Sequence, residues 1–91
     1  MEAKDYIDSL KQSYNTFRKK KLLLEDVKNP NDFYKLMDEV MEQIFYEERV
    51  HDNFYREHGH MPVIEKEYNN LCSYYTSVLE FFNLYRQLKN Y

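Results

Sequence analysis

Two glutamates and two histidines in the middle of the chain are the residues whose types and spacing could support chemistry. Glu48 and His51 have the i, i+3 spacing that di-iron carboxylate proteins use on a helix, and Glu47, His51 and His58 recur on one helical face. A complete di-iron site needs a second such motif on another helix, and the chain offers none. A metal site at Glu47, Glu48, His51 and His58 is therefore an alternative hypothesis, and we expect no cofactor.

A run of four cations, Arg18, Lys19, Lys20 and Lys21, is the only basic cluster and could contact phosphate groups of a nucleic acid. Four consecutive residues spread around the circumference of a helix, so they do not make a one-sided patch. The chain also carries a net charge of −3. Nucleic-acid binding is therefore a second alternative, and we favour pairing of these cations with carboxylates elsewhere in the fold.

Acidic residues concentrate in the middle third of the chain. Residues 29–59 carry eight Asp and Glu against three Lys and Arg, whereas residues 1–28 carry five against seven and residues 60–91 carry three of each. These acidic residues include Asp38, Glu39 and Glu42. They could steer a basic partner protein toward the chain, or they could simply form a solvated helix face.

Catalysis has little support in the sequence. Cys72 is the only cysteine, so the chain cannot form an internal disulfide, which fits a reducing compartment. It falls among apolar residues, where a thiol is usually inert. No glycine-rich phosphate loop, metalloprotease motif or pair of catalytic carboxylates is found. We therefore expect a protein that is not an enzyme.

The elements that must position these residues are set by two breaks, Asn29-Pro30-Asn31-Asp32 and His58-Gly59-His60-Met61-Pro62. The segments between them lack Gly and Pro and repeat apolar residues at helical spacing. We predict an all-α fold, a single-domain antiparallel three-helix bundle over residues 1–91, with helices at about 3–28, 32–58 and 62–90. Asn31 or Asp32 is expected to cap the second helix, and Gly59 to end it in a left-handed conformation.

The apolar stripes of the first two segments predict which faces are buried. In the first segment the stripe consists of Ala3, Ile7, Leu10, Tyr14, Phe17 and Leu24, with Lys21 as its one polar member. In the second segment the stripe Phe33, Met37, Val40 and Ile44 continues onto Glu47, His51, Phe54 and His58. That continuation places ionisable groups at core positions, and a rotated stripe through Val50 would avoid it.

The third segment has the most regular pattern, a heptad seam at Ile64, Tyr68, Leu71, Tyr75, Val78, Phe82 and Tyr85. A second stripe of Tyr74, Phe81 and Leu88 flanks the seam on one side. This helix is apolar over more than half of its circumference, so it either lies between both other helices or contributes a face to another chain. We therefore expect Tyr74, Phe81 and Leu88 to contact another protein, most simply a second copy in a two-fold homodimer.

Ten Tyr and six Phe accompany a single Ala, a bias that either AT-rich codon usage or a Tyr-rich contact surface explains. The N-terminal residues lack the apolar core of a secretory signal, and no stretch approaches the ~18 apolar residues that span a bilayer. We expect a cytoplasmic protein that does not enter membranes. Size and composition resemble those of small helical inhibitors and immunity proteins of AT-rich bacteria and their viruses, an analogy of class alone. The sequence thus favours a small acidic adaptor or inhibitor that binds a protein partner.

Overall fold

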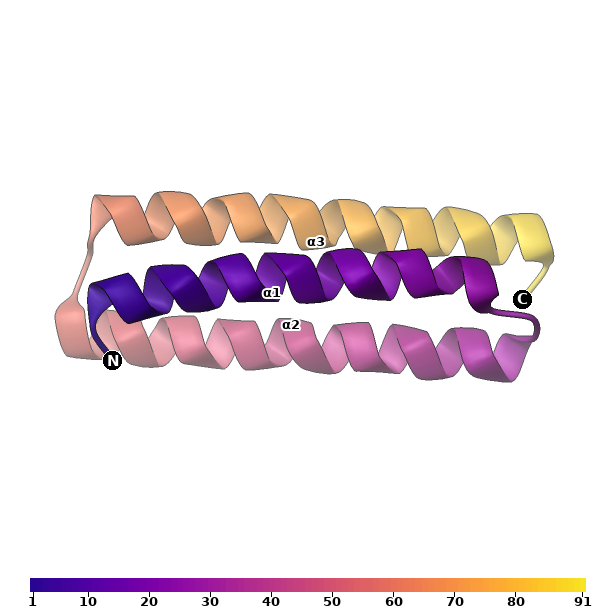
Figure 1. Cartoon of the computed structure of the whole chain (residues 1–91), viewed down its shortest axis with the longest axis horizontal. Helices are drawn as coiled ribbons and strands as arrows, with labels where there is room; N and C mark the ends of the chain where they lie inside the picture. Colours follow the sequence, from indigo (N-terminus) through magenta and orange to yellow (C-terminus); the bar gives the residue numbers. More distant parts are fainter.

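The computed structural model describes residues 1–91 as a bundle of three long helices, with extents of 45 × 17 × 16 Å. Helix α1 spans Ala3–Leu23 and is followed by a 3-10 turn, η1, at Leu24–Asp26. Helix α2 spans Pro30–His58 and helix α3 spans Pro62–Lys89. Short connections make α2 antiparallel to its neighbours, so α1 and α3 run in the same direction (Figure 1). The predicted all-α three-helix bundle is confirmed.

The two breaks work as the sequence predicts, with a correction at the start of α2. Pro30 is the first residue of this helix and Asn29 is its cap, because the Asn29 side chain accepts a hydrogen bond of 2.9 Å from the Asp32 amide. The prediction that Asn31 or Asp32 is the cap was wrong. Proline fits the first helical position, where its missing N–H needs no partner. Gly59 ends α2 with φ 72°, a conformation that a side chain would strain.

The core is a single cluster that runs along the bundle axis. It consists of fourteen buried residues: Tyr6, Leu10, Phe17, Leu24, Val27, Phe33, Leu36, Val40, Ile44, Phe54, Ile64, Leu71, Val78 and Phe82. The seam predicted for α3 is present, with its tyrosines partly buried against the cluster. On α2 the unrotated stripe holds as far as Phe54, because Glu47 is fully buried and His51 partly buried, but His58 at its end is exposed. Val50 of the rotated stripe is partly buried as well.

The buried face of α1 differs from the predicted one. Tyr6 and Ser13 are buried, whereas Ile7 is only half-buried and Tyr14 is 42% exposed. The helix is therefore rotated so that two residues with hydroxyl groups enter the core. This rotation is tolerated because both hydroxyls find hydrogen-bond partners on α2, as described below.

Candidate functional site

A buried carboxylate lies in the middle of the bundle. Ser13 Oγ on α1 donates a hydrogen bond to Glu47 Oε1, and Gln43 Nε2 donates a second bond of 2.7 Å to the same oxygen. The other oxygen, Glu47 Oε2, is buried without a partner. Glu47 takes part in no ion pair, and neither it nor Ser13 lines a cavity. Ser13 and Glu47 thus form a polar contact inside the core, whereas Gln43 also lines a hollow at the surface.

One turn further along α2, His51 joins all three helices. The Tyr6 hydroxyl lies 3.1 Å from His51 Nδ1, and Glu65 Oε1 lies 3.3 Å from His51 Nε2. A neutral imidazole with its proton on Nε2 satisfies both contacts, with Tyr6 as the donor to Nδ1. The Tyr68 ring stacks on the imidazole at a centroid distance of 3.8 Å. Burial raises the pKa of the Tyr6 phenol, so its proton stays available for this bond.

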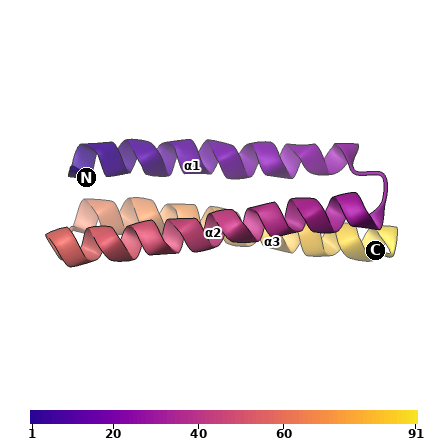
Figure 2. The same cartoon turned by 90° about the horizontal axis from the view of Figure 1, so that it is seen from below.

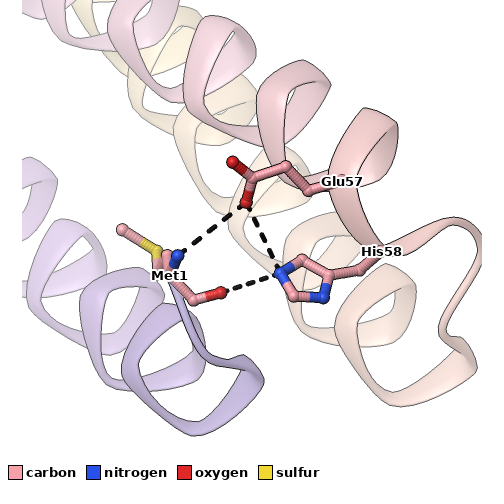
Figure 3. A network of polar contacts seen from close by, with 3 residues as sticks. All are labelled: Met1, Glu57 and His58. Carbon is pink, nitrogen blue, oxygen red and sulfur yellow. Dashed lines mark hydrogen bonds and ion pairs between the residues drawn. The ribbon is translucent and has the colours of Figure 1, made fainter.

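His58 holds the N-terminus of the chain against the end of α2 (Figure 3). Its Nε2 donates a hydrogen bond of 2.8 Å to the Met1 carbonyl oxygen. Glu57 Oε2 lies 3.5 Å from the same nitrogen and 3.8 Å from the Met1 amine. The imidazole also stacks on the Phe54 ring at 4.3 Å. His58 therefore contacts residues quite different from those that surround His51.

The four residues of the metal hypothesis are thus placed apart. Glu47 faces Ser13, His51 faces Tyr6 and Glu65, His58 faces the N-terminus, and Glu48 is exposed. No group of three or more His, Cys, Asp or Glu side chains has a geometry that could hold a metal ion. The structure therefore adds nothing in favour of a metal site.

The predicted basic cluster is divided among different surroundings. Lys20 Nζ donates a hydrogen bond of 2.8 Å to Glu39 Oε2 on α2, and this bond lowers the pKa of the Glu39 carboxyl. Lys21 Nζ lies 4.7 Å from the centre of the Phe81 ring on α3. Arg18 and Lys19 are exposed. Because only one of the four cations pairs with α2, the expected pairing with carboxylates holds for Lys20 alone.

The predicted partner-binding acids lie on α2, and two of them, Glu39 and Glu42, border Lys20 of α1. Asp38 and Glu42 are exposed, whereas Glu39 is partly covered by its ion pair with Lys20. Phe45 and Tyr46 are about half exposed on the same helix. This exposed surface of α2 is therefore acidic and aromatic, and it borders α1 at Lys20.

The flanking stripe of α3 lies along α1 and forms a second surface, which we call the α1/α3 face. Tyr74 stacks on Tyr14 with a centroid distance of 4.1 Å. Phe81 is 39% exposed beneath Lys21, and beyond it Leu88 is 76% exposed. Leu84, which is 53% exposed, lies within one helical turn of both Phe81 and Leu88. The predicted stripe is thus incompletely covered by the chain itself.

A shallow cavity of about 250 Å³ continues the α1/α3 face beyond the two tyrosines. Its lining combines apolar, amide and charged groups: Leu10, Lys11, Tyr14, Asn15, Glu67, Asn70 and Leu71. Burial raises the pKa of Tyr74, its neighbour Tyr14 raises it further, and Arg18 opposes both effects. Arg18 therefore acts on the same surface as the tyrosine pair.

Sequence reasoning missed the part that α1 plays in this face. Tyr14 was assigned to the core and Lys21 was treated as an interruption of an apolar stripe. The signal was present in the spacing: Tyr14 and Lys21 are seven residues apart, as are their partners Tyr74 and Phe81. Two parallel helices in register bring such pairs together.

No helix of the bundle combines the length and the apolar character that a bilayer crossing needs. Comparisons of the chain with family models, with curated proteins and with solved structures found no match.

Proposed function

We propose that the protein is a non-enzymatic interaction module, an adaptor or inhibitor that binds another protein through its α1/α3 face. One observation carries this proposal: Phe81, Leu84 and Leu88 are left exposed beside a tyrosine pair on the side of the bundle that faces away from α2. Contiguous apolar side chains of this kind mark interaction surfaces in soluble proteins.

The energy available from this face is consistent with specific binding. Full burial of a Leu or Phe side chain contributes about 1.5–3 kcal/mol, so the exposed parts of these three residues offer about 3–5 kcal/mol. Aromatic residues that lose few rotamers on binding, such as Tyr14 and Tyr74, are frequent energetic centres of interfaces. A partner that covered the whole face would also bury the shallow cavity beside Tyr14.

A two-fold homodimer through the same face is the partner arrangement that the sequence suggested first. In such a dimer the cations of α1, among them Arg18 and Lys21, would face either the same cations or the α3 stripe of the second copy, and neither offers them a carboxylate. Like charges in apposition oppose association. A different protein is therefore the partner that we favour.

Affinity capture from the native host tests the proposal with two matched variants. Leu84→Glu introduces a charge into the α1/α3 face, whereas Leu23→Glu introduces the same charge on α1 beside α2, where Leu23 is 47% exposed. A co-purifying protein should be lost with Leu84→Glu and retained with Leu23→Glu. Capture of no protein, or equal loss with both variants, would contradict the proposal.

A further inference from the structure

The two walls of the α1/α3 face differ in chemistry. On α1, Lys11, Tyr14, Arg18 and Lys21 follow one another at intervals of three, four and three residues, which places them on one helical face. On α3, the corresponding wall consists of Tyr74, Phe81, Leu84 and Leu88. The cations therefore line one wall of the face and the apolar side chains line the other.

Contacts within the chain leave these cations able to meet a partner. Arg18 and Lys11 are exposed and take part in no ion pair, and Lys21 lies on the Phe81 ring. The carboxylates that border this row are Glu67, at the edge of the shallow cavity that Lys11 also lines, and Asp8 and Glu25, which stand three residues before Lys11 and four residues after Lys21. Lys11, Arg18 and Lys21 thus form a positive strip beside the exposed Leu84 and Leu88, in a protein whose net charge is −3.

We propose that the α1/α3 face binds an acidic amphipathic helix of another protein. The inference rests on the proposed function and names the partner's chemistry. Apolar residues of the partner helix, at i, i+3 or i+4, and i+7, would pack on Phe81, Leu84 and Leu88. Its carboxylates, along one edge of that stripe, would pair with Lys11, Arg18 and Lys21. About four helical turns cover the distance from Tyr74 to Leu88.

A second copy of the chain fits this face less well. The surface of the chain that complements a basic wall is the acidic outer side of α2, but α2 lies on the far side of the bundle from the α1/α3 face (Figures 1 and 2). If α2 of one copy docked onto the α1/α3 face of another, one free α1/α3 face and one free α2 surface would remain at the two ends. Further copies could then add without limit, so no closed dimer would form.

A nucleic acid also fits less well. Single-stranded nucleic acids stack their bases on free aromatic faces. Tyr14 and Tyr74 each give one ring face to the other, and Lys21 lies over one face of Phe81, so fewer aromatic faces are left for bases. Leu84 and Leu88 offer a base no hydrogen bond. The positive strip therefore favours carboxylates on a helix over phosphates on a flexible strand.

Two synthetic peptides test the inference by fluorescence anisotropy. Both have about 18 residues and the same leucine stripe, and they differ only in carrying Glu or Lys beside that stripe. The acidic peptide should bind the wild-type protein at least about tenfold more tightly than the basic one, and about 0.5 M salt should weaken its binding. Because the protein has a net charge of −3, global electrostatics favour the basic peptide, so this preference must arise from the local strip.

Charge reversal at neighbouring residues locates the site. Arg18→Glu should weaken binding of the acidic peptide by about fivefold or more, whereas Lys19→Glu, with the same change in net charge, should alter it by less than about twofold. Equal weakening by both variants would overturn the inference. So would a preference for the basic peptide, or no binding of the acidic peptide at about 1 mM.

Two further probes identify a different occupant. Binding of a labelled oligothymidylate that Arg18→Glu abolishes would replace the helix with a nucleic acid. Self-association in sedimentation experiments that Leu84→Glu abolishes would replace it with a second copy. If a captured host protein is lost with Leu84→Glu although the acidic peptide does not bind, the interaction face stands and only the proposed partner chemistry fails.

Discussion

Replacing the buried carboxylate should make the protein more stable. Glu47 Oε2 is buried without a hydrogen-bond partner, and the side chain forms no ion pair. Glu47→Met keeps the length of the side chain and removes both oxygens. An unsatisfied buried polar group costs about 1–3 kcal/mol, and exchanging buried charged groups for packed apolar ones often stabilises a protein by about 1–4 kcal/mol.

Two hydrogen bonds are lost in this variant, which reduces the gain. Gln43 is half-buried and can turn its amide toward water, and the Ser13 hydroxyl can bond to a carbonyl one turn earlier on α1. With about 1 kcal/mol assigned to these losses, we expect a net gain of about 1–2 kcal/mol in the free energy of unfolding. For a domain of this size, the melting temperature should rise by about 4–8 °C for each kcal/mol.

Urea denaturation and thermal melts followed by circular dichroism measure this change. Glu48→Met, at the exposed neighbouring residue, is the matched control and should change the unfolding free energy by less than about 0.5 kcal/mol. Ser13→Ala alone should destabilise the protein, because it leaves Glu47 with only the Gln43 bond. A loss of more than about 1 kcal/mol in Glu47→Met would show that the Ser13–Glu47–Gln43 cluster is net stabilising and would refute the reasoning.

The remaining predictions concern the polar contacts and the helix end. Tyr6→Phe should lower the free energy of unfolding by about 1 kcal/mol in urea titrations, because His51 Nδ1 loses its donor; an unchanged midpoint would disprove this role. Burial raises the pKa values of Tyr6, Tyr68 and Tyr75 above that of an unfolded tyrosine, so the stability they contribute is complete below about pH 10 and is lost as pH rises further. Tyrosinate absorbance of these residues should therefore appear together with loss of helical circular dichroism, and full ionisation with the helices intact would contradict the prediction. Gly59→Ala should cost about 1–3 kcal/mol in thermal unfolding because its φ is 72°, although no atom lies near enough for a clash, and an unaltered melting temperature would exclude such strain.

Much of the fold could be predicted from the sequence because helix-breaking residues are few and occur only between the helices. Pro30, Gly59 and Pro62 separate segments that contain no other helix breaker, so the number and lengths of the helices follow from local rules. The errors concern details that local rules leave open. Helix α2 begins two residues earlier than predicted, and the last turn of the first segment tightens into a 3-10 turn.

The orientation of α1 could not be predicted from the sequence in the same way. Apolarity alone favours Ile7 and Tyr14 as core residues over Tyr6 and Ser13. The latter two are buried because Tyr6 reaches His51 and Ser13 reaches Glu47 on another helix. A sequence does not reveal which hydroxyl meets which acceptor across a bundle. Such hydrogen-bonded pairs can decide which face of a helix is buried, even against the pattern of apolar residues.

For the same reason, only part of the candidate site could be predicted from the sequence. Tyr74, Phe81 and Leu88 emerged from heptad spacing on α3, and the structure leaves the latter two exposed. The contribution of Tyr14 and Lys21 depends on the rotation of α1, so spacing on a single helix could not reveal it.

Hydroxyl-radical footprinting of the protein in native-host extract, compared with buffer, tests most directly whether a partner covers the α1/α3 face. Phe45 and Tyr55 on α2 are about half exposed and serve as internal controls for Phe81, Leu84 and Leu88. Our account predicts that oxidation of these three residues falls several-fold in extract while the two α2 residues react as in buffer. Protection confined to the α2 aromatic residues, or equal oxidation of every residue in both conditions, would contradict it.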